Sequence, residues 1–180
     1  MLDRLRVYAG VGSRTTPAHV LDVMKQLGFA LARAGGVLRS GAAEGADSAF
    51  EQGARDAGGV CRIYLPWRGF NHRPNDAITY LVPSDQDFER AFQIARSVHP
   101  AWDRLTRPQR LLHARNVFQV LGLSCDRPCD AVICFTPGGR QVGGTATALK
   151  IADRWSVPVH NLGSPDVYAQ WTQYFGDRPS

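Results

Sequence analysis

The sequence has 180 residues, of which 44% are hydrophobic and 21% charged; this balance is typical of a globular protein and excludes a disordered chain. No stretch is apolar for long enough to cross a membrane, and the N-terminal residues lack the apolar run of a secretory signal, so we expect a cytoplasmic protein. The net charge of +5 favours anionic partners without identifying nucleic acid.

The basic residues are almost all arginines, because Lys25 and Lys150 are the only lysines in the chain. Arginine holds phosphate or carboxylate groups with paired hydrogen bonds, which favours such ligands, although a GC-rich gene would produce the same bias.

The first third of the chain predicts a β-α-β-α-β unit, with strands over 5–10, 37–38 and 61–65 and helices over 17–34 and 45–56. Thr16 is placed to cap the first helix, and Gly35 and Gly36 to end it. Short apolar strands that alternate with helices indicate a parallel sheet with right-handed crossovers.

The rest of the chain continues this alternation after a loop at 67–83. We expect a helix over 85–97 capped by Ser84 and then a helix over 108–121, a strand over 130–135, a helix over 144–155, a strand over 157–162 and a helix over 165–175. The predicted fold class is α/β, a Rossmann-like three-layer sandwich with a mainly parallel central sheet.

Four cysteines raise the question of a metal site. Cys61 and Cys134 lie within apolar runs, which predicts buried strand positions. Cys125 and Cys129 have no second pair at a spacing typical of zinc ligands, and the histidines, among them His72, His99 and His113, show no such spacing either. We therefore expect neither a metal nor a cofactor.

Three loops that follow predicted strands carry small and polar residues suited to phosphate binding. Glycine allows the close approach of an anion, hydroxyl groups and arginine donate hydrogen bonds, and helix N-termini present free amides. The candidates are Gly10, Gly12, Ser13 and Arg14 in the first loop, Ser40, Gly41, Gly45 and Asp47 in the second, and Gly143, Gly144 and Thr145 in the third. The first loop is also compatible with a strand-to-helix turn that needs glycine for its geometry, and the third with a flexible surface loop. Asp47, in the first helical turn, could simply complement the helix dipole; otherwise it would contact either a ligand hydroxyl or the amides of a neighbouring loop.

Two further segments suit nucleotide recognition. The loop at 67–83 offers Trp67 and Phe70 for stacking on a base, with partial burial as the alternative. The segment 102–115 combines Trp102 with four arginines, a composition that fits either a nucleic-acid surface or a solvated helix face; these arginines are Arg104, Arg107, Arg110 and Arg115.

The combination of these motifs resembles the SLOG superfamily, which includes DprA, the LOG phosphoribohydrolases and the YpsA-related proteins of phages and bacteria. The resemblance covers about residues 6–162 and rests on GSR, RSGAAEGAD, the YLPW…N loop, the GGT loop and VPVHNL. It implies one Rossmann-like domain over 1–180 with a helical insertion at about 84–121. It also adds Asn71, Arg115 and Asn116 as ligand-binding residues, the last two as the RN pair of the YpsA-related branch.

The resemblance leaves catalysis open. LOG-type hydrolases carry a catalytic glutamate in PGGxGTxxE, and the corresponding position here is Ala148. Cleavage of an N-glycosidic bond normally needs a carboxylate, and the candidates to replace it are Glu44, Asp47 and Asp76.

We therefore expect the chain to bind a phosphorylated nucleoside, a nucleotide or an ADP-ribose-like ligand, as a sensor or a nucleotide-processing protein. The first and third loops would face one another and hold the phosphate between them. The alternatives are an N-glycosidase or phosphoribohydrolase that acts on nucleotides, and a DprA-like single-stranded DNA-binding protein. Helix 87–98 has one apolar face that suits either a homodimer surface or the core; its residues are Phe88, Ala91, Phe92 and Ala95.

Overall fold

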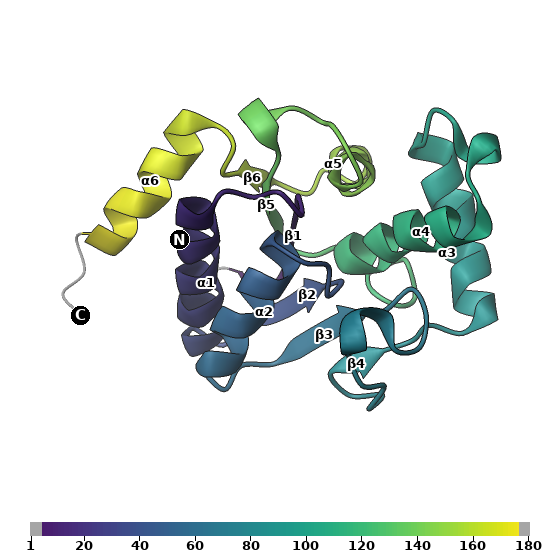
Figure 1. Ribbon diagram of the computed structural model, residues 1–180, viewed down its shortest axis with the longest axis horizontal. Coiled ribbons are helices and arrows are strands. Elements are labelled where there is room, and N and C mark those ends of the chain that lie inside the picture. Colours follow the sequence, from purple (N-terminus) through teal and green to yellow (C-terminus); the bar gives the residue numbers. More distant parts are fainter. Residues whose placement is uncertain (1–4, 177–180) are drawn as a thin grey trace.

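The computed structural model describes residues 5–176, and its centre is a six-stranded sheet of order β4-β3-β2-β1-β5-β6 (Figure 1). All neighbouring strands in this sheet run parallel. The strands are β1 (Val7–Gly12), β2 (Val37–Ser40), β3 (Cys61–Tyr64), β4 (Tyr80–Leu81), β5 (Ala131–Phe135) and β6 (Val159–Asn161). The fold is therefore α/β and Rossmann-like, as the sequence predicts.

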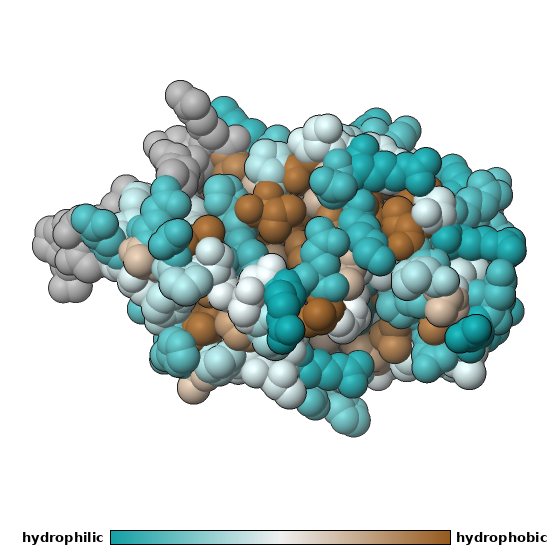
Figure 2. All heavy atoms as spheres, turned by 90° about the horizontal axis from the view of Figure 1, so that it is seen from above, coloured by the Kyte–Doolittle hydropathy of each residue, from teal (hydrophilic) through white to brown (hydrophobic). Residues whose placement is uncertain are grey.

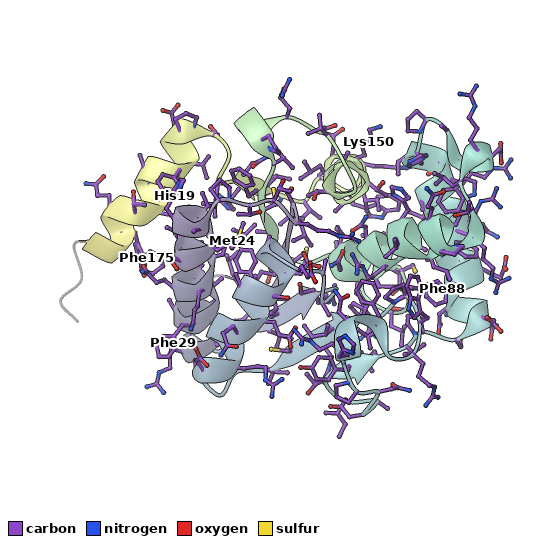
Figure 3. The ribbon with its side chains drawn as sticks, viewed as in Figure 1. His19, Met24, Phe29, Phe88, Lys150 and Phe175 are labelled. Carbon is purple, nitrogen blue, oxygen red and sulfur yellow. The ribbon has the colours of Figure 1, made fainter. Side chains whose placement is uncertain are left out.

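Helices cover both faces of the sheet and complete three layers (Figure 1). They are α1 (Ala18–Arg33), α2 (Ala46–Asp56), α3 (Asp85–Val98), α4 (Arg107–Leu121), α5 (Thr145–Arg154) and α6 (Pro165–Gly176). One core lies between the sheet and α1, α2 and α6, and the other between the sheet and α3, α4 and α5. Figure 3 labels one residue of each core, Met24 on α1 and Phe88 on α3.

The local signals for helix ends have mixed outcomes. Ser84 caps α3 as predicted, because its hydroxyl accepts a hydrogen bond from the amide of Asp87. The prediction that Thr16 caps α1 is wrong, since α1 begins after Pro17 and the Thr16 hydroxyl donates instead to the carbonyl of Ser13. Gly35 follows the end of α1 with a φ of +83°, a conformation that glycine adopts at little cost.

The sequence does not predict β4, which lies inside the segment expected to be a loop. The side chain of Asp76 accepts hydrogen bonds from the amides of Ile78, Thr79 and Tyr80, and this turn brings Tyr80 and Leu81 alongside β3. A strand of two residues is too short to show a period of two.

The apolar face of α3 is mainly core. Phe88, Ala91 and Ala95 are buried, and Phe92 packs against Trp102 with 5.8 Å between ring centroids. Cys61 and Cys134 occupy buried strand positions, as predicted, and all four cysteines are free thiols.

The outer surface seen from above shows hydrophobic residues in separate areas between hydrophilic ones (Figure 2). Within residues 5–176, no helix combines the length and the apolar composition that spanning a membrane requires.

Candidate functional site

A cavity of about 440 Å³ lies where the C-terminal ends of β1 and β5 meet α4. This edge of a parallel sheet is the usual place for a ligand. The cavity is lined by Val11, Gly12, Ser13, Arg14, Ala43, Asp47, Gln109, Leu112, His113, Arg115, Asn116, Pro137, Val142, Gly143, Gly144 and Thr145. The first and third predicted loops, far apart in sequence, therefore share one cavity.

The loop after β1 forms one wall and is held by hydrogen bonds. The Ser13 amide donates to the carbonyl of Phe135 at 3.2 Å, and the Ser13 hydroxyl accepts from the amide of Thr15 at 3.1 Å. A Cβ atom at Gly12 would lie 2.6 Å from the Cβ of Ala46, so this turn needs glycine in order to pack against α2. The Arg14 side chain is exposed on this wall.

The loop before α5 forms the opposite wall. Gly143 has a φ of +67°, Gly144 is the N-cap residue of α5, and no side chain caps the helix. The amide of Thr145, at the first helical position, has no intrahelical acceptor, and the N-terminal end of a helix attracts negative charge. A Cβ atom at Gly143 or Gly144 would meet nothing within 4 Å, so these backbone groups border open space.

Arg115 on α4 brings a buried cation to the cavity. Its side chain packs over the Phe70 ring, and its Nη1 donates to the carbonyl of Gly41 at 2.6 Å, but its Nε has no hydrogen-bond partner. Within the described part of the chain, no carboxylate forms an ion pair with Arg115. Burial lowers the pKa of this guanidinium, and the nearby Asp47 opposes that shift.

Asp47 on α2 is also buried, and it makes the loop contact that the sequence left as one of two alternatives. Its Oδ2 accepts hydrogen bonds from the amide of Ala43 and from Gln119 Nε2, each at 3.4 Å. Burial raises the pKa of this carboxyl group, while Arg115 and the backbone amides act in the opposite direction. Asp47 therefore supports the loop after β2 and also lines the cavity.

Helix α4 contributes more residues than the sequence indicated. Asn116, which was predicted, donates from Nδ2 to the carbonyl of Gly144 at 3.0 Å and so holds the loop before α5. Gln109, Leu112 and His113 line the cavity but were not predicted as site residues. Their approach depends on how α4 crosses the sheet, for which the sequence carries no local signal.

The second predicted loop mostly supports the cavity from behind. The Ser40 hydroxyl donates to the carbonyl of Gly10, and a Cβ atom at Gly10 would lie 2.7 Å from the Phe50 ring. Gly45 has a φ of +80° and packs against the carbonyl of Ser13. Four residues of the second loop do not line the cavity: Ser40, Gly41, Gly45 and the exposed Glu44. Gly10 of the first loop does not line it either.

The loop at 67–83 likewise stays outside the cavity. Trp67 packs edge-on against Phe70, which itself lies under Arg115, and the Asn71 side chain donates to the carbonyl of Ala42. Asp76 is exposed and organises its own turn. Phe70 is buried, as one of the two alternatives from the sequence had it, whereas Trp67 is 40% exposed and lies outside the cavity.

The arginine-rich segment 102–115 does not form one surface. Trp102 is only 6% exposed, and Arg110 lies over its ring at 5.7 Å. Arg104, which precedes α4, and Arg107, at its start, are exposed, whereas Arg115 faces the cavity from the middle of α4. Trp102 is therefore not available to stack on a base.

Two solved structures share this fold. The Chlamydomonas rheinhardtii Moco carrier protein is 18% identical with a TM-score of 0.54, and the match covers 96% of this chain and 84% of that protein. DNA processing protein A from Helicobacter pylori, solved for its single-stranded DNA binding mode, is 17% identical with a TM-score of 0.54, over 98% of this chain and 76% of that protein.

No curated protein matches the sequence significantly. A family model, described as the SLOG cluster4 family, matches residues 7–101, which is more than half of the chain. The match includes both strand-to-helix loops of the first half and ends before α4. On this match, the chain belongs to the SLOG cluster4 family.

Proposed function

We propose that the chain binds a phosphorylated nucleoside, either a nucleotide or an ADP-ribose-like molecule, in the cavity between β1, α4 and α5. Its phosphate would lie between two loops, with Gly12, Ser13 and Arg14 on one side and Gly143, Gly144 and Thr145 on the other. The free amide at the start of α5 and the Arg14 guanidinium are both suited to hold an anion there.

The observation that carries this proposal is the state of Arg115. A buried charge without an opposite charge costs several kcal/mol, on the order of the whole stability of a small domain. Arg115 is 7% exposed, and among the described residues its side chain has one hydrogen bond, to a carbonyl group, while its Nε has no partner and no carboxylate forms an ion pair with it. A bound anion would supply that ion pair.

The carboxylates near the cavity favour ligand binding over hydrolysis as its function. Of the three candidate carboxylates, only Asp47 lines the cavity, and it is buried and bonded to Ala43 and Gln119. Ala148, at the position of the LOG-type glutamate, is fully buried. An N-glycosidase would need a carboxylate free to stabilise positive charge on the sugar or to activate water, and neither residue offers one.

We also propose that residues 1–180 form one SLOG-like domain in which about 84–121 is a helical insertion. The support is that α4 supplies Arg115 and Asn116 to a cavity whose other walls come from β1 and α5. We propose no particular homodimer surface, because Phe88, Ala91 and Ala95 on α3 are occupied within the core.

Thermal-shift and calorimetric titrations with AMP, ADP-ribose, NAD and deoxynucleotides test the function. A ligand that binds only the folded state at about 100 times its Kd stabilises that state by about 2.7 kcal/mol. Arg115→Met and Arg14→Ala should abolish or weaken the shift. Arg140→Ala is the matched control, because Arg140 is exposed on the same loop as Gly143 but does not line the cavity.

The outcomes are distinct. Chromatography of the same mixtures reveals any released base, and a released base would show that the protein is a nucleotide hydrolase. Oligonucleotide binding that falls steeply with salt, without a response to any small nucleotide, would overturn the proposal in favour of single-stranded DNA.

A further inference from the structure

His113 is held on the cavity wall by a hydrogen bond between two helices. Its Nδ1 lies 2.8 Å from the hydroxyl oxygen of Thr147, a residue in the first turn of α5 that is 3% exposed. Within the described residues, Nε2 has no hydrogen-bond partner. The ring is therefore fixed in place and keeps one nitrogen available.

The groups around His113 are mostly cationic or basic. The His99 ring, just after α3, lies 4.4 Å from the His113 ring, and burial together with Lys150 on α5 (Figure 3) lowers the pKa of His99. Arg115 on α4 and Arg14 in the loop after β1 line the same cavity.

Asp47 on α2 is the acidic group that faces this cavity. Burial raises the pKa of Asp47 while Arg115 and backbone amides act in the opposite direction, and within the described residues Asp47 forms no ion pair with any of these cations. Burial, His99 and Arg115 lower the pKa of His113 to about 4. The imidazole is therefore neutral at physiological pH in the absence of a ligand, because a further positive charge would be both buried and repelled.

We propose that His113 determines the specificity of this cavity for doubly charged anions, such as a terminal phosphate or a sulfate, by taking up a proton when the anion binds. This inference rests on the proposed function, since it concerns the same cavity. The proton comes from solvent and forms an N–H bond on the imidazole, and no other bond changes. A phosphodiester carries one negative charge per phosphate, so it favours protonation of His113 less than a doubly charged group does. The site should therefore bind a nucleotide's terminal phosphate more tightly than an internal one.

Sulfate is the appropriate probe because it stays doubly charged throughout the pH range used, whereas a phosphate monoester titrates. An imidazole whose pKa returns to about 6.5 in the complex gives about tenfold tighter sulfate binding at about pH 5.5 than at about pH 7.5. Calorimetry in two buffers of different ionisation enthalpy should show proton uptake, and the His113 imidazole signals in NMR should show its pKa rise when sulfate is added.

Two variants separate the sources of the proton. His113→Gln keeps a partner for Thr147 but does not titrate, so its sulfate affinity should lose the pH dependence. Asp47→Asn removes the carboxyl group that lines the cavity as a source of proton uptake, and its sulfate affinity should keep the pH dependence. The neighbouring His99 has its own imidazole signals in NMR, which separate its titration from that of His113. The NMR signals of the unmodified protein answer the question if either variant fails to fold.

The outcomes distinguish this inference from the function on which it depends. Sulfate binding that does not vary with pH, or a pH dependence that survives in His113→Gln and disappears in Asp47→Asn, overturns the role of His113 alone. If neither sulfate nor any nucleotide binds at any pH, the proposed function fails, and the inference fails with it.

Discussion

Arg115 Nη1 donates a hydrogen bond to the carbonyl oxygen of Gly41 across 2.6 Å, which joins α4 to the loop after β2. The guanidinium also packs closely against the Gly41 backbone and leaves no room for a side chain there, since a Cβ atom at Gly41 would lie 2.6 Å from Arg115 Nε. The position of the buried cation therefore depends on a glycine that does not itself line the cavity.

Gly41→Ala should displace the Arg115 guanidinium and weaken nucleotide binding. A steric conflict of about 1–3 kcal/mol corresponds to a loss of roughly tenfold to a hundredfold in affinity if the cation moves away from the ligand. Calorimetric titration measures the affinity, and urea unfolding confirms the fold. An unchanged affinity in a folded variant would show that Arg115 is not part of the binding site.

Arg115→Met should lose nucleotide affinity while its free energy of unfolding stays within about 1 kcal/mol of the original. The buried charge costs stability, and its removal offsets the loss of the hydrogen bond to Gly41 and of the contact with Phe70. Urea unfolding without ligand measures this. A loss of more than about 3 kcal/mol would mean that Arg115 is mainly a structural residue.

Glu51→Gln should lower the free energy of unfolding by about 2 kcal/mol without changing nucleotide affinity. Glu51 is 3% exposed, accepts hydrogen bonds from the Tyr80 hydroxyl and the Arg73 guanidinium, and lies outside the cavity. Part of the ion pair is screened, since the Arg73 side chain is 30% exposed.

The matched control for Glu51→Gln is Gln52→Ala. Gln52 is exposed, and its side chain donates a hydrogen bond only to Asp56 on the same helix. Its removal should leave the free energy of unfolding within about 0.5 kcal/mol. If the two variants lose the same stability, the buried network around Glu51 does not hold β4 against α2.

Gly53→Ala should destabilise the protein by about 3 kcal/mol or prevent folding. A Cβ atom at Gly53 would lie 1.9 Å from the carbonyl oxygen of Lys25, so α1 and α2 could not keep their present distance. Gly28 makes the reciprocal close approach from α1 to the Phe50 carbonyl. A thermal melt of the variant measures the loss, and an unchanged melting temperature would contradict this packing.

Stability should fall as the pH rises above about 9. Burial raises the pKa of the Cys61 thiol from 9.0 to about 11, and burial and Glu51 raise that of Tyr80 from 10.0 to about 12. Groups whose pKa is higher in the folded state lose protons first in the unfolded state, so their contribution is present below about pH 9 and lost progressively above it. Urea unfolding at about pH 8 and about pH 10.5 measures this fall, and Tyr80→Phe should reduce it.

Much of the fold could be predicted because its signals are local. The apolar spacing from Val20 to Leu31, the Gly35 stop and the Ser84 cap each act within a few residues. β4 could not be predicted, since the turn organised by Asp76 determines it and two residues carry no period. Thr16 has a residue type that often caps helices, but Pro17 is the N-cap residue of α1 and the Thr16 hydroxyl donates a hydrogen bond to the carbonyl of Ser13.

For the candidate site, the sequence by itself determined which anion-binding groups the first and third loops carry, because these are set by residue type. It also determined that both loops follow parallel strands, because this is set by the order of the elements. The sequence also predicted that the first and third loops face one another, and Ser13 and Thr145 do line one cavity. Only the tertiary structure decided that Trp67 stays outside this cavity and that α4 adds Gln109 and His113 to its wall. These relationships join residues that are far apart in the chain. They depend on how helices pack on the sheet, and no short stretch of sequence encodes that packing.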